Sequence, residues 1–397
     1  MKEQDFQLLK LIMAIGNLDN NNERCIYYIL NRNRLIDYNM IYVDLENGQD
    51  RTQYLNKFVE MNYDFNSLFY SNKLMVMNYD VVCNDFLYKP SNMPYQICVS
   101  FDLNIVSMLK GYNGKTEFKD EVLSKVIKIC KEKKCAFDIM GYVIENFLKN
   151  KENPGLDDFA IKDIRNFEEM FPYQKSKYSL EFVDIETRMN QLLEMYNSDE
   201  FKEMCIYLYK EIYQLEYTYL LAIVHIFFKY RKLSSKHKLD KFIEFCVLEI
   251  KALHPCASNL AKLFYDDPNL KFFKRIQKNN KNIVATIENM AWDLFHLRFL
   301  EFAVETSHEN KKIVLVPIFI TKDNGLNEIR KAYQLKCLFQ NIKTGKVIRS
   351  YYMNVITEDY AKKYSDDQSI KKRIEEQHDF NALSKKIEKM ILDDIND

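Results

Sequence analysis

The sequence predicts an α/β protein in which helices outnumber strands, and three observations carry that prediction. Two apolar runs, at 96–101 and 311–323, read as buried strands that lead to an aspartate, and the first passes into a helical pattern. Almost all of 155–281 places apolar residues at helical spacing. Only 8 Gly and 7 Pro interrupt the chain, which leaves few long loops.

Length and charge bound the class of protein. At about 150 residues per domain, 397 residues predict two or three compact units. Lys and Arg number 57, as do Asp and Glu, so bulk charge does not favour coating of nucleic acid or an anionic membrane. A local basic groove stays compatible with this balance. The 47% hydrophobic content is that of a globular protein.

Cysteine usage and hydropathy predict a cytoplasmic protein with no membrane span. The nine Cys contain no CxxC pair, and the closest pairs, Cys130/Cys135 and His254/Cys256, do not make a zinc site. We therefore expect free buried thiols in a reducing compartment. The start of the chain is too charged for a signal peptide. The longest apolar run, 217–228, is shorter than the ~20 residues of a membrane span and predicts a buried helix.

Strand and helix patterns divide the chain into five regions. Strands are expected at 38–45, 73–82 and 135–140, and helices at 50–61 and 115–134. Later segments predict a helix at 283–304, a hairpin formed by 334–340 and 346–355, and a charged helical tail at 358–397. The regions are a mixed α/β part at 1–95, a split core at 96–150 and 283–330, a helical insertion at 151–282, and a hairpin with a helix at 331–397.

Four acidic residues stand out by their context. Asp102 and Asp323 follow apolar strands, and ligands of parallel sheets bind at the carboxyl ends of strands. Glu145 and Asp293 interrupt apolar helices, where an unpaired buried carboxylate is costly. A divalent cation is one compensation for that cost, and oxygen ligands suit Mg²⁺ or Mn²⁺.

The order of these motifs resembles the PIN-like nuclease family. The segments FDLNIVSML at 101–109, YVIENFL at 142–148, AWDLFHLRFLE at 291–301 and FITKDNGL at 319–326 carry the resemblance. It covers about a quarter of the chain and implies a PIN-like parallel-sheet core. Leu103 departs from the family, which commonly has a small hydroxyl residue there. The interval between Glu145 and Asp293 exceeds that of a compact core by more than a hundred residues, which the helical insertion would fill.

The resemblance implies metal-dependent cleavage of phosphodiester bonds in RNA or single-stranded DNA. Two Mg²⁺ or Mn²⁺ ions, about 3.5–4 Å apart, would hold the scissile phosphate and generate hydroxide. Asp102, Glu145, Asp293 and Asp323 would be the ligands, and Asn104 and Thr321 would orient them. The elaborate architecture suggests a toxin or an antiviral defence effector. A rival hypothesis is a non-catalytic PIN-like or helical interaction protein that binds a protein or nucleic-acid partner, and the sequence also leaves an oligomer open.

Each candidate also has a structural interpretation. Asp102 and Asp323 are placed to cap helices, and Asp293 could pair with Arg298. Asp138 could assist Glu145 or cap the helix that carries it, and His296 could touch substrate or serve as a hydrogen-bonded structural residue.

Two basic runs predict a surface for the phosphate backbone, with a solvated helix end as the alternative. Lys232 and Lys236 represent the run at 229–241, and Lys274 and Arg275 the run at 271–282. Phe272 and Phe273 lie within the second run, where aromatic rings could stack on bases.

Overall fold

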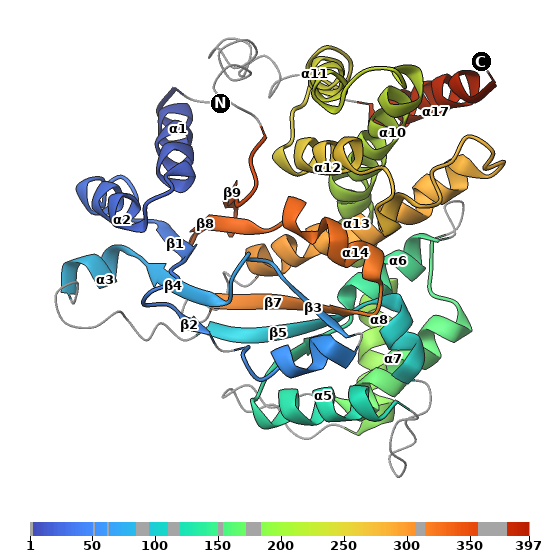
Figure 1. The fold of residues 1–397 in the computed structure, drawn as a ribbon. Helices are drawn as coiled ribbons and strands as arrows, with labels where there is room; N and C mark the ends of the chain where they lie inside the picture. Colours follow the sequence, from blue (N-terminus) through green and yellow to red (C-terminus); the bar gives the residue numbers. More distant parts are fainter. Residues whose placement is uncertain are drawn as a thin grey trace.

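The computed structural model describes residues 3–50, 52–61, 63–84, 95–109, 120–149, 154–171, 184–306, 314–355 and 379–396. Within these ranges the chain forms a mixed α/β structure with two sheets, so the predicted α/β class is confirmed (Figure 1). The part of the charged tail at 358–378 lies outside the described residues.

The four-stranded sheet has the order β3-β7-β5-β6 and lies at the centre of the molecule (Figure 1). Strands β5 (Tyr95–Phe101), β6 (Ala136–Asp138) and β7 (Val314–Thr321) run parallel, and β3 (Asp64–Ser67) pairs antiparallel with β7. The three parallel strands correspond to apolar runs from which strands were predicted. Because β5 and β7 are neighbours in parallel register, the residues that follow them emerge side by side.

The five-stranded sheet is antiparallel in its pairings and joins the two ends of the chain. Its strands, in spatial order, are β2 (Gln49–Asp50), β4 (Lys73–Met77), β1 (Tyr38–Val43), β8 (Leu335–Asn341) and β9 (Val347–Tyr351). The predicted hairpin is confirmed, since β8 and β9 pair antiparallel. Its pairing with β1 was not predicted, because no local pattern reports a partner some three hundred residues away.

Two local predictions in the first region were wrong. Asp50 accepts hydrogen bonds from the backbone and side chain of Thr52, and this turn precedes a 3₁₀-helix, η1 (Asn56–Met61), where an α-helix was expected. The strand expected at 73–82 stops early. The side chain of Asn78 accepts from the amide of Val81, which favours the start of helix α3 (Tyr79–Asn84) over a longer strand.

Helices fill the described chain between β6 and β7. Several begin at a capping side chain that accepts a backbone N–H, as Asp120, Asp157, Asp184, Ser198 and Ser234 do. The helices that follow β5 and β6 are α4 (Leu103–Met108), α5 (Glu121–Glu132), α6 (Met140–Leu148), α7 (Asp158–Met170), α8 (Ile185–Asn197), α9 (Asp199–Leu208), α10 (Gln214–Lys229), α11 (Ser235–Phe245), α12 (Pro255–Asp266) and α13 (Ile283–Thr306). Two π-helical turns, η3 (Tyr209–Tyr213) and η4 (Cys246–Ile250), interrupt the series.

Helix α10 is buried along most of its length, as its apolar run predicted. The terminal helix α17 (Phe380–Asn396) packs along it, and two side-chain hydrogen bonds fix the pair: Thr218 to Ser384 at 2.8 Å and Tyr217 to Glu388 at 2.8 Å. Among the described helices, not one combines the length and the apolar content that crossing a membrane requires.

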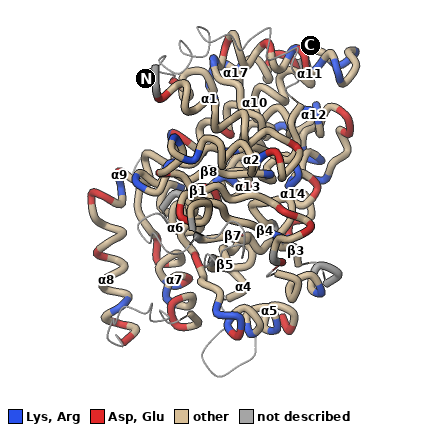
Figure 2. Tube along the Cα trace, turned by 90° about the vertical axis from the view of Figure 1, so that its left-hand side faces the viewer, with Lys and Arg blue, Asp and Glu red and all other residues tan. Residues whose placement is uncertain are grey.

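Helix α13 connects the helical layer to the central sheet, because it packs against both α10 and β7. Its apolar residues therefore face two partners. Polar residues on the same helix, Asp293, His296, Arg298 and Glu301, lie where these layers meet. Elsewhere, acidic and basic residues intermix over the outer elements (Figure 2), in keeping with the net charge of zero.

Candidate functional site

Asp102 lies where strand β5 ends and turns toward β7. Its amide donates to the carbonyl of Ile320 at 3.0 Å, which continues the pairing of the two strands. One carboxylate oxygen, Oδ2, accepts from the hydroxyl of Thr321 at 2.8 Å and from the amide of Asn104 at 3.3 Å. Asp102 occupies the N-cap position of α4, yet its side chain does not cap that helix. The capping interpretation of Asp102 was therefore wrong, and its carboxylate is held toward the neighbouring strand end.

Asp323 lies two residues beyond β7 and is tied to the same threonine. Its amide donates to the hydroxyl of Thr321 at 2.9 Å. Its Oδ1 caps helix α14 (Asn324–Ile329), accepting from the amides of Gly325 at 2.6 Å and Leu326 at 3.4 Å. The capping interpretation is thus confirmed for Asp323. Thr321 links the two acids, as it donates to one and accepts from the backbone of the other.

Asp293 projects from α13 into the neighbourhood of these strand ends. Its carboxyl is half-buried, and burial raises its pKa to about 8, with the negative charges of Asp102 and Asp323 adding to the shift. Asp102 and Asp323, which follow β5 and β7, therefore lie near enough to Asp293 on α13 for their charges to act on it. The alternative in which Asp293 pairs with Arg298 was wrong, because the guanidinium of Arg298 donates to Glu301 instead.

Glu145, on α6, is connected to this group of acids by a hydrogen bond to His296. Its Oε2 lies 2.8 Å from Nε2 of His296, and both side chains are buried. Burial opposes protonation of His296, but the hydrogen bond and charge of Glu145, with the charges of Asp102 and Asp293, outweigh burial and raise the pKa of the imidazole. His296 is thus hydrogen bonded, as one of the two interpretations expected.

Two features of the chain allow this contact. The imidazole of His296 stacks on the ring of Phe319 in β7, with centroids 5.6 Å apart. Gly141 lets α6 approach closely, because a Cβ there would lie only 2.9 Å from Nδ1 of His296. Any larger residue at position 141 would push the histidine away from Glu145.

Asp138, at the end of β6, is a further acid at this edge of the sheet. It accepts from the amide of Met140, the first residue of α6, at 3.0 Å and from the hydroxyl of Ser100 at 3.2 Å, although the N-cap residue of that helix is Ile139. Burial raises its pKa, and the hydrogen bonds from Met140 and Ser100 partly offset that shift. The signal in the sequence was the same as for Asp102: an acid directly after a short apolar run.

The donor chemistry of the cluster suits a hard divalent cation, because its candidate ligands are carboxylates held in a buried, mutually repulsive group. In the described ranges, however, no three His, Cys, Asp or Glu side chains approach closely enough to enclose an ion. Glu145 is engaged with His296, and Asp323 uses one oxygen as a cap. Ion binding would thus require these side chains to exchange partners.

The predicted basic residues lie on neighbouring surface segments. Lys232, Lys236, Lys274 and Arg275 are all exposed. The backbone of Phe272 packs against Gly325, which lies two residues after Asp323. The segment that carries Lys274 and Arg275 therefore borders Asp323. Ser235 donates to Asp266 at the end of α12, which brings the first basic run next to the second.

The expected base-stacking role of Phe272 and Phe273 was wrong. Both rings are buried, and Phe273 stacks on Phe264 with centroids 4.0 Å apart. Both rings pack in the apolar interior because the short η5 turn (Lys271–Phe273) folds back onto α14 and α12.

Comparisons with protein-family models, with curated proteins and with solved structures return no match to this chain.

Proposed function

We propose that this protein hydrolyses phosphodiester bonds of RNA or single-stranded DNA with Mg²⁺ or Mn²⁺, using a PIN-like core. One observation carries the proposal: three acids from separate elements, Asp102, Asp293 and Asp323, gather at the carboxyl edge of a parallel sheet, where the pKa of Asp293 is raised to about 8. A cluster of buried like charges is unfavourable by itself, and a bound cation would remove the cost.

Each residue has a role in this proposal. Asp102, Glu145, Asp293 and Asp323 would hold the ions, which activate water and stabilise charge on the phosphate when bound. Thr321 and Asn104 fix the orientation of the Asp102 carboxylate through their hydrogen bonds. His296 holds Glu145 close to the cluster through their hydrogen bond.

The basic surface supports a polyanionic substrate. Lys274 and Arg275 are exposed on the segment that packs beside α14, whose capping residue is Asp323. Lys232 and Lys236 extend this surface along α11 and its preceding turn. A strand that follows these residues would pass next to the acids, with its backbone contacts supplying salt-dependent affinity.

The test is cleavage of end-labelled RNA and single-stranded DNA with Mn²⁺ or Mg²⁺, with and without EDTA. We expect cleavage that EDTA abolishes and that Asp102→Asn lowers by about two orders of magnitude or more. Asp199→Asn is the matched control, because Asp199 is an exposed acid on α9 outside the cluster. Thermal unfolding of each variant checks the fold. Equal activity of Asp102→Asn and the parent chain would assign the cleavage to another source.

A non-catalytic interaction protein is the second candidate, and the Glu145–His296 pair favours it. Glu145, one of the predicted ligands, is already hydrogen bonded to His296, so it has a partner within the chain without an ion. This candidate predicts retention of RNA or single-stranded DNA in a filter-binding assay with no cleavage under any metal condition. Cleavage that depends on Asp102 would exclude it.

A further inference from the structure

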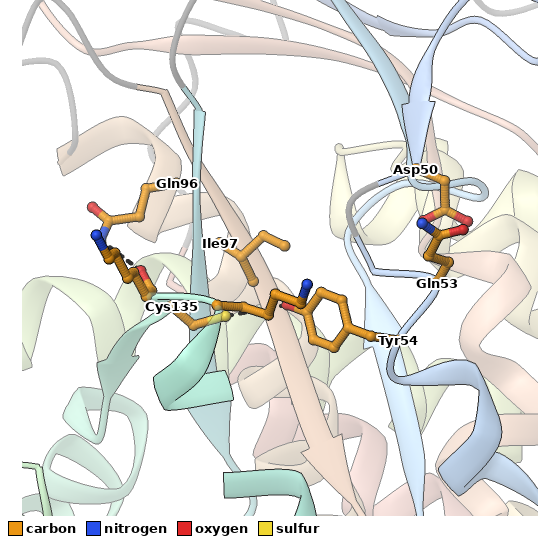
Figure 3. Close-up of a pocket in the computed structure, with 8 residues that line it drawn as sticks. Asp50, Gln53, Tyr54, Gln96, Ile97 and Cys135 are labelled. Carbon is orange, nitrogen blue, oxygen red and sulfur yellow. Dashed lines mark hydrogen bonds between the residues drawn. The ribbon is translucent and has the colours of Figure 1, made fainter. Parts of the chain in front are cut away.

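A pocket lies at the amino edge of the central sheet, the edge opposite the acids. Its volume is about 340 Å³, and the starts of β5 and β6 contribute to its wall (Figure 3). The lining residues are Asp50, Gln53, Tyr54, Gln96, Ile97, Lys133, Lys134 and Cys135. Cys135 is of interest because a second thiol, that of Cys130, lies next to it.

The end of helix α5 brings these two thiols together. Lys134 adopts a left-handed conformation with φ of 55°, and its amide donates to the carbonyl of Lys131 at 2.9 Å. The amide of Cys135 donates to the carbonyl of Cys130 at 3.0 Å. These are the two hydrogen bonds of a Schellman motif, in which the side chains at the positions of Cys130 and Cys135 contact each other. Those side chains are usually apolar, whereas here both are thiols.

Both thiols are buried, and they differ in their partners. Cys130 is completely buried on α5, whereas Cys135 forms part of the pocket wall. The two sulfur atoms are hydrogen bonded to each other, and the hydroxyl of Tyr54 lies 3.2 Å from Sγ of Cys135. Figure 3 shows the ring of Tyr54 and the sulfur of Cys135 directed toward one another across the pocket.

The same contacts separate the acidities of the two thiols. The hydrogen bond with Cys130, helped by that of Tyr54, overcomes burial and lowers the pKa of Cys135 to about 7. That hydrogen bond, with burial, raises the pKa of Cys130. The exposed ammonium of Lys133 sits 5.7 Å from the centroid of the Tyr54 ring, so a positive charge borders the pocket. Such surroundings favour a thiolate at Cys135 and a thiol at Cys130.

We propose that Cys130 and Cys135 form a reversible redox pair in which a small hydroperoxide oxidises Cys135 and Cys130 then closes a disulfide. The Cys135 thiolate attacks one peroxide oxygen, the O–O bond breaks, and hydroxide leaves to give a sulfenic acid. The sulfur of Cys130 then attacks the sulfur of Cys135, the S–O bond breaks, and water leaves with the thiol proton. Two thiols are oxidised and one hydroperoxide is reduced.

The pair differs in acidity from four other buried cysteines, whereas Cys83 is exposed to solvent. Burial raises the pKa of Cys98, Cys205, Cys246 and Cys256, which keeps them as thiols at neutral pH. The lowered pKa of Cys135 gives it a larger thiolate share at pH 7 than an unperturbed cysteine has. We therefore expect Cys135 to be oxidised before Cys98, Cys205, Cys246 and Cys256.

The experiment treats the full chain with hydrogen peroxide at pH 7, blocks remaining thiols, and digests with a lysine-specific protease. A disulfide between Cys130 and Cys135 would join the peptide 129–131 to the peptide 135–149, because Lys131, Lys133 and Lys134 lie between them. We expect this joined peptide to dominate the oxidised products and to disappear after treatment with dithiothreitol. Oxidation of other cysteines at an equal rate, with the pair still reduced, would overturn the proposal.

Single substitutions separate the role of Cys135, which reacts with the peroxide, from that of Cys130, which closes the disulfide. In Cys130→Ser, we expect Cys135 to accumulate as a sulfenic acid that dimedone traps, whereas the parent chain should show little adduct. Cys205→Ser is the matched control, because Cys205 is a buried thiol on α9 away from the pocket, and it should behave as the parent chain does. Equal dimedone labelling of the parent and Cys130→Ser would contradict closure by Cys130. Peptide mapping of the parent chain gives an answer even where a variant folds poorly.

Discussion

Two buried groups of charges lie near one another along helix α13, and they are balanced in different ways. The first, which we call the arginine cluster, consists of Glu216, Arg298, Glu301, Arg349 and Tyr351. The second, the strand-end acids, consists of Asp102, Glu145, Asp293 and Asp323 with His296. Both contain carboxylates removed from water, so both need a compensation for desolvation.

The arginine cluster supplies that compensation from the chain itself. Arg298 lies 3.2 Å from Glu216 and 2.7 Å from Glu301, and its guanidinium also donates to the hydroxyl of Tyr351 at 2.7 Å. Arg349 pairs with Glu301 as well. Two acids thus meet two arginines, which connects α10, α13 and β9. Burial nevertheless raises the pKa of Glu216 to about 7, because its carboxylate is removed from water.

The strand-end acids have no such balance. In the described part of the chain, the largest influences on the pKa of Asp293 are burial and the acids Asp102 and Asp323, which His296 opposes. The comparison teaches that a buried acid does not mark a site by itself. A group of acids with few cations beside it is a candidate site, because either protonation or a bound cation has to compensate its charge.

The largest expected effect is on the arginine cluster. Arg298→Met would leave Glu216 and Glu301 buried with fewer partners, so we expect the free energy of unfolding to fall by about 3–5 kcal/mol. Urea unfolding followed by circular dichroism measures this. A variant as stable as the parent chain would show that this cluster is not balanced by Arg298.

Metal binding should affect only the strand-end acids. Mn²⁺ at about a hundred times its dissociation constant should raise the free energy of unfolding by about 2.7 kcal/mol in the parent chain, because ions bind the folded state. Asp293→Asn should lose most of this stabilisation. Thermal unfolding with Mn²⁺ and with EDTA checks both statements, and an equal shift in Asp293→Asn would place the ion elsewhere.

The pH dependence of stability in EDTA should reveal the unbalanced acids. The pKa of Asp293 is about 8 in the folded protein against an ordinary value of 3.8, so the folded state keeps a proton that the unfolded state releases. This stabilising contribution is complete below pH 3.8 and is lost as the pH rises toward 8. Between pH 5 and 7.5 we expect a loss of about 3 kcal/mol, measured by urea unfolding, that Asp293→Asn lacks. Parallel pH profiles for the two proteins would contradict this.

The smallest effect is expected from Tyr351→Phe. The change removes the hydroxyl that accepts from Arg298 and donates to Glu301, so we expect a loss of about 0.5–1.5 kcal/mol in unfolding free energy. The Mn²⁺ shift should be unchanged, since the strand-end acids do not include this residue. A diminished Mn²⁺ shift would mean that the two clusters act as one.

Much of the central sheet could be predicted because its signals are local. The apolar runs that became β5 and β7 and the aspartates that follow them are readable from short windows of sequence. The hydrogen bond of Glu145 to His296 was not predicted, since it joins residues on α6 and α13 that a long helical segment separates. The burial of Phe272 and Phe273 was missed for a similar reason: a basic run reads as solvated until a partner covers its aromatic residues.

The sequence by itself determined the α/β class, the helical stretch between the two halves of the core, and the acids at the strand ends. These depend on residue periodicity and on neighbours within a few positions. The tertiary structure alone decided that the first and last strands share a sheet, and that Asp102, Asp293 and Asp323 meet in one charged group while other buried acids meet arginines. Such pairings depend on contacts between distant segments, which packing selects and local patterns do not encode.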